Sequence, residues 1–312
     1  MTFAEQYRRN YPEGAAFSEY ITRDGWPLRV FSWPASGHER GSILFQGGRG
    51  DTIEKYLETF ADWHHQDWSV TSFDWRGQGG SGRFIANPHI GHCPDFAIWI
   101  EDLKEFYADW EAKSSGPHSV IGHSMGGHLV LRAMAEKAIR PHAAVLISPM
   151  LGFDTGKLPL EWANWLVQQL IKIGLGKRVA WRRNERPAPP WAKRQKFLTN
   201  DVARYSDEIW WKLKKPELEL GPPSFQWLQQ AYSSILALEK PGVIESIDIQ
   251  ISVFGTRGYK LVSPEAIVEF TERMPFADLK MYDVDVAHEI LRERDDVRED
   301  ALSLIDFFLG TL

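Results

Sequence analysis

Short apolar runs alternate with longer amphipathic segments along most of the chain. Residues 19–33 contain two runs rich in β-forming residues around Asp24-Gly25, which predicts a β-hairpin at one edge of a sheet. The further strands predicted are Ser42–Phe45, Trp68–Phe73, Ser119–Ile121, Ala143–Ser148, Ile247–Gly255 and Leu279–Tyr282. The helices predicted between and after them are Ile53–His65, Asp95–Trp110, Met125–Lys137, Pro264–Arg273 and Asp296–Leu309. This alternation predicts an α/β protein whose mostly parallel sheet is covered by helices on both faces.

The alternation stops at about residue 151 and resumes at about residue 241. Residues 151–240 carry helical patterns and proline-rich joints without a convincing strand, which predicts a helical cap inserted into a core made of residues 1–150 and 241–312. Half of the 14 tryptophans lie in this cap segment, namely Trp162, Trp165, Trp181, Trp191, Trp210, Trp211 and Trp227. They either form the core of the cap or line an apolar substrate channel, and the sequence leaves both roles open.

Composition excludes several classes of protein. A hydrophobic fraction of 43% and a charged fraction of 25% are ordinary for a soluble globular chain of 312 residues. The net charge of -6 gives no general attraction to nucleic acid, so no nucleic-acid partner is expected. Cys93 is the single cysteine, and no run approaches the roughly 18 apolar residues of a membrane span. We therefore expect a cytoplasmic protein.

One motif carries a specific chemistry. The segment Gly122-His123-Ser124-Met125-Gly126 matches G-x-S-x-G directly after a predicted strand and directly before a predicted helix. That context is typical of a nucleophile elbow, in which a strained backbone lifts the serine hydroxyl above the sheet. The sequence therefore predicts an α/β-hydrolase fold with Ser124 as the nucleophile.

A serine nucleophile needs a base and two N–H groups that stabilise an oxyanion. If the order along the chain is serine, acid, histidine, the base is His288, which follows the last predicted strand. Met125 follows the nucleophile and supplies one N–H group. The glycine-rich loop after Phe45 supplies the other, for which we choose Arg49.

Four segments of the chain resemble the bacterial lysophospholipase L2 branch of the monoglyceride-lipase-like hydrolases. They occur in the order of that family and span nearly the whole chain: Gly48–Tyr56, Phe73–Arg83, Gly122–Gly127 and Ala287–Glu293. The resemblance implies hydrolysis of fatty-acyl esters of glycerol or glycerophospholipid, with Ser124 as nucleophile and His288 as base. It implies no cofactor.

The chain departs from this family at the catalytic acid. The family pattern resembles Asp-Lys-Leu-Val, whereas this chain has Tyr259-Lys260-Leu261-Val262, or Gly258 at the acid position in a gapless alignment. Neither residue can orient the imidazole as a carboxylate does. The substitutes considered are Asp154, Asp283 and Asp285, each of which is more simply a solvated loop residue. The alternative function is therefore a catalytically impaired hydrolase-fold protein that binds an apolar ligand.

Three weaker signals remain. The segment Gly77–Gly82 fits G-x-G-x-x-G, but no helix is predicted after it, which argues against a dinucleotide site. His89, His92 and Cys93 lack a distant fourth ligand, so no metal is expected. The basic stretch 177–196 is either a solvated face or a peripheral contact with the inner membrane through the cap.

Overall fold

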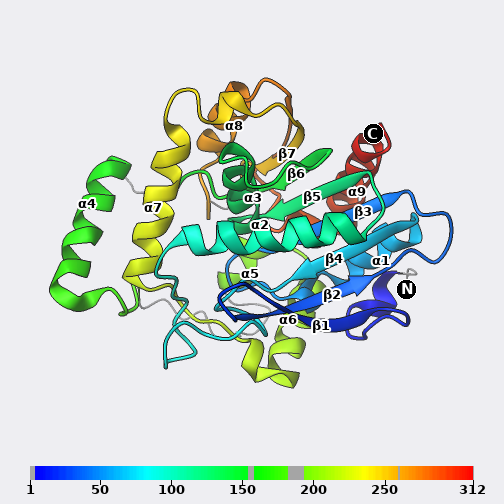
Figure 1. Ribbon diagram of the computed structural model, residues 1–312, viewed down its shortest axis with the longest axis horizontal. Coiled ribbons are helices and arrows are strands. Elements are labelled where there is room, and N and C mark those ends of the chain that lie inside the picture. The colour runs from blue at the N-terminus through cyan, green and yellow to red at the C-terminus, as the bar shows by residue number, and fades with distance from the viewer. Residues whose placement is uncertain (1–3, 154–157, 182–192, 259–260, 312) are drawn as a thin grey trace.

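The computed structural model describes residues 4–153, 158–181, 193–258 and 261–311, and these form one sheet flanked by helices (Figure 1). The strands are β1 (Ala16–Ile21), β2 (Pro27–Trp33), β3 (Gly41–Gln46), β4 (Trp68–Phe73), β5 (His118–His123), β6 (Ala143–Ile147), β7 (Gln250–Thr256) and β8 (Ala277–Tyr282). Their order in space is β1-β2-β4-β3-β5-β6-β7-β8. The β1–β2 and β2–β4 pairs are antiparallel, and β4 to β8 run parallel. The predicted fold class is therefore confirmed.

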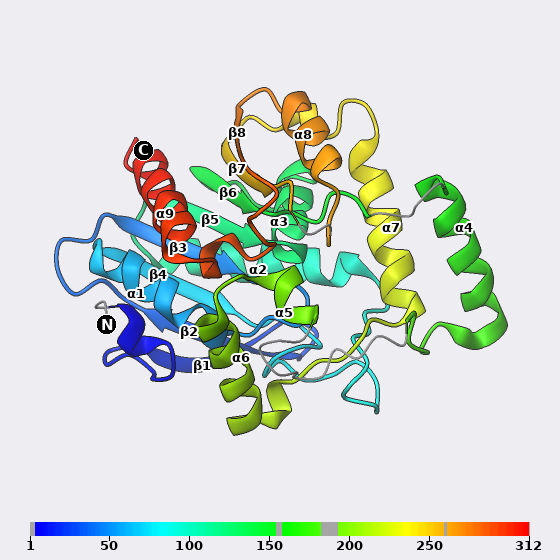
Figure 2. The same ribbon diagram turned by 180° about the vertical axis from the view of Figure 1, so that it is seen from behind.

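Helices cover both faces of the sheet. The helices of this core are α1 (Leu57–His65), α2 (Phe96–Lys113), α3 (Met125–Ala135), α8 (Pro264–Arg273) and α9 (Asp295–Leu309). One apolar core joins α2, α3 and α8 to the sheet, and a second joins α1 and α9 to its other face. Figure 1 shows the first face, and Figure 2 shows the second. The central strands β3, β5 and β6 are buried along their whole length, which explains why they are continuous apolar runs.

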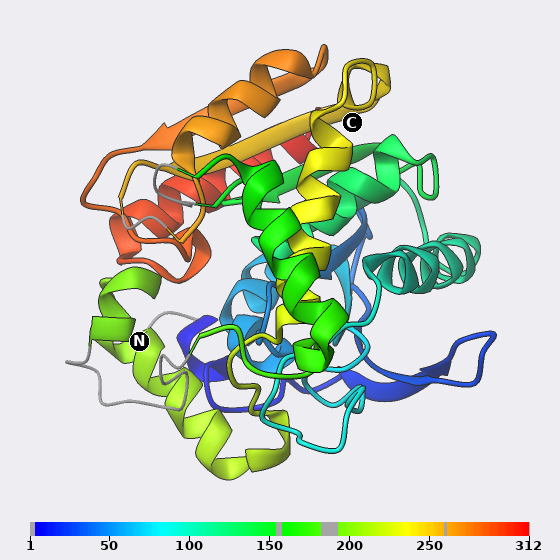
Figure 3. The ribbon, with the colours of Figure 1, turned by 90° about the vertical axis from the view of Figure 1, so that its left-hand side faces the viewer.

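Between β6 and β7, the described residues contain helices and no strand of the sheet. The helices are α4 (Leu160–Leu170), α5 (Lys193–Leu198), α6 (Val202–Lys214) and α7 (Phe225–Glu239), with a π-helical turn at Ile171–Leu175. α4 and α7 pack side by side, and α5 and α6 lie apart from them (Figure 3). Short 3-10 helices occur at Ala4–Tyr7, Ile53–Tyr56, Pro216–Leu218, Ile244–Ser246 and Ile290–Arg292.

The predicted elements agree with the observed ones except at their ends. The Asp95 side chain accepts a hydrogen bond from the Ala97 amide and caps α2 as predicted. The predicted helix 53–65 begins with a 3-10 turn. The seventh strand starts at Gln250, later than predicted, since Ile247 ends the 3-10 helix Ile244–Ser246 and is buried outside the sheet.

Candidate active site

Ser124 lies at a sharp turn between β5 and α3. Its backbone has φ 52° and ψ -116°, a conformation that residues other than glycine rarely adopt. The Ser124 N–H donates to the Ile147 carbonyl of β6 at 2.9 Å, and the Ser124 carbonyl accepts from the Met150 amide at 3.0 Å. These bonds hold the strained residue in place, and the predicted elbow is therefore present.

The glycines around Ser124 are required by close backbone contacts. A Cβ atom on Gly126 would lie 2.3 Å from the Gln46 carbonyl oxygen at the end of β3. A Cβ atom on Gly122 would lie 2.7 Å from the backbone of Gly127. The elbow therefore packs directly against the carboxyl end of β3, where the predicted oxyanion loop begins.

His288 lies beside Ser124 on the loop between β8 and α9. Its Nε2 atom is 3.0 Å from the Ser124 hydroxyl oxygen, which is hydrogen-bonding distance. The ring is buried, and its Nδ1 atom has no hydrogen-bond partner in the described part of the chain. The main chain of His288 is held instead, because its carbonyl accepts from the Ser148 hydroxyl at 2.8 Å and its amide donates to the Phe197 carbonyl at 3.3 Å.

The surroundings of His288 favour the neutral imidazole. Burial holds the pKa of His288 well below its usual range, and the nearby His123 and Lys55 act in the same direction. Asp51 acts in the opposite direction. A neutral imidazole can accept a proton from Ser124, but among the described residues no carboxylate lies on Nδ1 to stabilise the imidazolium formed in that step.

None of the substitute acids contacts Nδ1 of His288 in the described structure. Asp283 is exposed, and Asp285 forms a 2.6 Å ion pair with Arg294, which lowers the pKa of Asp285. In this conformation neither of them pairs with His288, and a role as the acid stays a prediction for both. Asp154 and Tyr259 lie outside the described residues.

Gly258, the gapless alternative to Tyr259, is described. Its amide donates to the Thr256 hydroxyl at 3.0 Å. A Cβ atom on Gly258 would lie only 2.0 Å from the carbonyl oxygen of Val286. The loop after β7 therefore presses against the chain just before His288, and position 258 has no room for a side chain.

The predicted oxyanion loop approaches Ser124 at Gly48, where a Cβ atom would lie 3.0 Å from that of Ser124. The Gly48 amide donates to Asp51 Oδ2 at 2.8 Å. The Arg49 guanidinium donates to the Gly221 carbonyl at 2.8 Å and therefore links this loop to the cap segment. The roles of the Arg49 and Met125 amides stay predictions.

Asp51 is a site residue that the sequence motifs did not indicate. Its Oδ2 atom also accepts from the Tyr56 hydroxyl at 2.7 Å and lies 3.0 Å from His123 Nδ1. The His123 ring is in turn 5.1 Å from the His288 ring, centroid to centroid. Although burial opposes ionisation, the Lys55 ammonium and His123 hold the pKa of Asp51 well below its usual range. A buried carboxylate is thus separated from His288 by one imidazole.

The other candidate motifs have structural roles. His92 Nδ1 lies 2.9 Å from the Ser224 hydroxyl, and the Cys93 thiol donates to the Asp95 carbonyl. No group of three or more histidine, cysteine, aspartate or glutamate residues suited to a metal ion occurs among the described residues. After Gly77–Gly82 the next helix is α2, which begins at Phe96.

A strained serine between a strand and a helix, with a late histidine at 3.0 Å on a sheet of this order, defines an α/β-hydrolase. The chain belongs to the family described as serine aminopeptidase, S33, whose model matches residues 37–295. Probable lysophospholipase L2 of Haemophilus influenzae is 28% identical over 278 residues, which cover 87% of this chain and 84% of that protein. Lysophospholipase L2 of Escherichia coli K12 is 26% identical over 321 residues, and the match covers 93% of this chain and 86% of that protein.

Solved structures agree on the fold. A soluble variant of monoglyceride lipase from Saccharomyces cerevisiae matches with a TM-score of 0.73 at 18% identity, covering 96% of this chain and 95% of that one. Monoacylglycerol lipase of Paleococcus ferrophilus matches with a TM-score of 0.69 at 18% identity, and the match covers 91% of this chain and 98% of that one. At this identity the likeness concerns the fold alone. The resemblance to lysophospholipase L2 and the class of carboxylic ester hydrolase, both expected from the sequence, are confirmed by the curated relatives.

Proposed function

We propose that this chain hydrolyses fatty-acyl carboxylic esters of the lysophospholipase or monoacylglycerol lipase type through an acyl-Ser124 intermediate. The observation that carries the proposal is the 3.0 Å contact between Nε2 of the buried His288 and the hydroxyl of the strained Ser124. The names of the curated relatives support a lipid ester as the substrate.

In the proposed reaction, Ser124 Oγ attacks the ester carbonyl carbon while its proton passes to His288 Nε2. The oxygen of the tetrahedral intermediate carries the negative charge, and the amides of Met125 and Arg49 stabilise it. When the intermediate collapses, the bond to the alcohol breaks and His288 returns its proton to the leaving oxygen. Water then attacks the acyl-serine with His288 again as base, which releases the fatty acid and restores the Ser124 hydroxyl.

A fluorophosphonate probe tests this proposal without knowledge of the native ester. The probe is expected to label Ser124 of the native chain, because only an activated serine reacts readily. Mass spectrometry of the labelled peptide locates the adduct, and Ser124→Ala is expected to abolish both labelling and ester hydrolysis. Heat-denatured protein is the control. Labelling at another residue, or ester hydrolysis by the alanine variant, would refute the assignment.

Nδ1 of His288 has no hydrogen-bond partner in the part of the chain that the structure describes, which favours one alternative, a protein that binds an apolar ligand without turning it over. Such a protein would retain the fold but lack an activated serine. Native protein that is not labelled, together with saturable binding of a fatty acid, would support this alternative.

We further propose that the cap segment contacts a lipid surface through one face of α4. Apolar side chains that are 47% to 70% exposed lie along it and the following turn: Trp162, Trp165, Leu166 and Ile173. Lys172, Lys177 and Arg178 are also exposed nearby. Amphipathic helices that lie on membranes combine aromatic and aliphatic residues with basic ones in this way. No helix in the described part of the chain is long and apolar enough to cross a bilayer.

Replacing Trp162 and Trp165 together by serine is expected to lower partitioning onto phosphatidylcholine vesicles by roughly 30-fold, since burying the two exposed indoles contributes about 2 kcal/mol. Vesicle sedimentation measures the change, and hydrolysis of a short-chain soluble ester should stay within about twofold. Phe307→Ser is the matched control, because Phe307 is 75% exposed but lies on α9. Equal losses in the two variants would rule out a specific role for α4.

A further inference from the structure

The structure leaves open how the His288 ring is kept in place. In a complete triad a carboxylate on Nδ1 holds both the orientation and the tautomer of the imidazole. Here Nδ1 has no partner in the described residues, so orientation depends on the loop that carries the ring. The position of that loop relative to Ser124 therefore determines where the imidazole lies.

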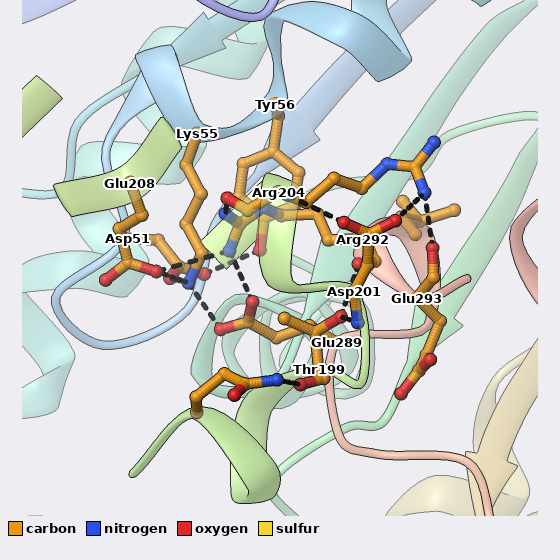
Figure 4. Close-up of polar contacts among 12 residues, drawn as sticks. Asp51, Lys55, Tyr56, Thr199, Asp201, Arg204, Glu208, Glu289, Arg292 and Glu293 are labelled. Atoms are coloured by element: carbon orange, nitrogen blue, oxygen red, sulfur yellow. Dashed lines mark hydrogen bonds and ion pairs between the residues drawn. The ribbon is translucent and has the colours of Figure 1, made fainter. Parts of the chain in front are cut away.

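The loop is fixed by a buried cluster of charges centred on Lys55 (Figure 4). The Lys55 ammonium lies 2.5 Å from Asp51 Oδ1, 2.5 Å from Glu289 Oε1 and 3.5 Å from Glu208 Oε2. Arg292 pairs with the other oxygen of Glu289 and lies 3.2 Å from Glu208. All five side chains are at most 7% exposed. The cluster therefore belongs to the protein interior.

Each of the three carboxylates around Lys55 comes from a different part of the site. Asp51 belongs to the loop after β3 and binds the Gly48 amide next to Ser124. Glu289 directly follows His288 in the chain. Glu208 lies on α6 of the cap segment. One ammonium thus joins the two loops that flank Ser124 and ties both to the cap.

We propose that Lys55 is a positioning residue, which holds the His288 loop, through Glu289, at a fixed distance from the Gly48 loop, through Asp51. Lys55 thereby keeps the imidazole oriented, which in a complete triad the catalytic carboxylate does. The proposal rests on the function proposed above, since it concerns how His288 serves Ser124.

Hydrogen bonds between the cap segment and main-chain atoms of the same loop also hold it in place. The Glu289 amide donates to the Leu198 carbonyl at 2.8 Å, and the Thr199 hydroxyl donates to the Arg292 carbonyl at 2.6 Å. The Arg204 guanidinium donates to the Glu293 carbonyl at 2.7 Å and forms a two-bond pair with Glu58 on α1. These bonds fix the backbone after His288, and Lys55 and Arg292 hold the side chain of Glu289.

The charges in the cluster are matched so that Lys55 stays protonated. Although its burial opposes a charge, Asp51, Glu208 and Glu289 raise the pKa of Lys55 above its usual range. Lys212, Lys55 and Arg292 hold the pKa of the buried Glu208 well below its usual range. Lys55 therefore remains a cation throughout the pH range in which His288 titrates.

Lys55→Met tests the proposal, because methionine keeps most of the side-chain length without the charge. We expect kcat for a short-chain ester and the rate of fluorophosphonate labelling of Ser124 to fall at least about tenfold, with KM within about twofold, since small misplacements of a catalytic group lower rates steeply. Lys55 also lowers the pKa of His288, so the acid limb of the pH profile should move to higher pH in this variant.

Lys212→Met is the matched control. Lys212 is equally buried and lies 2.5 Å from Glu208, but the described contacts do not connect it to Asp51 or Glu289. Both variants should lose thermal stability, and kcat is compared at a temperature at which circular dichroism shows both to be folded. Only Lys55→Met should lose activity, and Lys55→Arg should recover it to within about threefold of the native chain.

If Lys55→Met does not fold, Glu289→Gln replaces it, and the same loss of kcat is expected. Equal loss of kcat in Lys55→Met and Lys212→Met, or unchanged kcat in Lys55→Met, would overturn the proposal. A native chain that the probe does not label would instead refute the proposed function, so the two failures are distinguishable.

Discussion

Tyr259→Asp is expected to raise kcat/KM for a short-chain ester at neutral pH by at least about a hundredfold, which corresponds to roughly 2.7 kcal/mol in the activation barrier. The reason is that no residue described in the structure forms a hydrogen bond with Nδ1 of His288. Loss of the acid from a complete triad lowers turnover by about 10⁴, so restoring a carboxylate at the position where the family carries it should recover part of that factor.

The pH profile gives a second readout of the same variant. Burial keeps the pKa of His288 well below its ordinary value, so in the native chain the base form should persist below pH 6.5. An opposite charge on Nδ1 stabilises the imidazolium and raises this pKa. The acid limb of kcat/KM should therefore move to higher pH in Tyr259→Asp, although the plateau rises.

Gly258→Asp is the matched control for Tyr259→Asp. It adds the same carboxylate one position earlier, where the Val286 carbonyl leaves no room for a Cβ atom. We expect a loss of stability and no gain in rate. If Tyr259→Asp also gives no gain, asparagine variants of Asp154, Asp283 and Asp285 show whether one of these already acts as the acid in the substrate complex.

His288→Ala is expected to lower kcat only by about a hundredfold in the native background but by at least about 10⁴ in the Tyr259→Asp background, because the gain from the added acid is lost together with the base. In a complete triad, removal of the base lowers kcat by about 2 × 10⁶ and removal of the acid alone by about 3 × 10⁴. The quotient of these factors, roughly 70, is what a histidine without its acid contributes. The unequal losses would measure how strongly base and acid act as one unit.

Single-turnover kinetics with one short-chain ester measures both losses. His38→Ala, in the exposed loop before β3, is the control and should change neither rate. A loss smaller than about tenfold for His288→Ala would mean that another group serves as base, and His123, whose ring lies 5.1 Å from that of His288, is the candidate to test.

Sequence pattern predicted the sheet, the elbow and the late histidine because each depends on residues that are close in the chain. The G-x-S-x-G segment carries its own turn geometry, and the central strands are apolar because both faces of the sheet are covered. The meeting of Ser124 with His288 followed from the order of the motifs and the shared carboxyl edge of the strands.

The ionic cluster could not be predicted in this way. Lys55 lies in the family-like segment Gly48–Tyr56 and Glu289 in Ala287–Glu293, but the resemblance does not indicate that these charges pair in the interior, and charged residues are seldom buried. Their burial depends on contacts between segments that are more than 80 residues apart, as the separation of Lys55 and Glu289 by 234 positions illustrates. Local pattern contains no information about such pairing. The role of Asp51 was missed for the same reason.

The ionic cluster also determines how the molecule responds to acid. The pKa values of Asp51 and Glu208 are held well below their usual range in the folded state, so both carboxylates add stability above the unfolded-state pKa of about 4. That contribution is lost as the pH falls through the lower, folded values, because protonation then removes the charges that pair with Lys55. Glu208 is the carboxylate that joins α6 to this cluster. Protonation of Glu208 should therefore weaken the attachment of α6 in the same pH range in which protonation of Asp51 releases the loop beside Ser124.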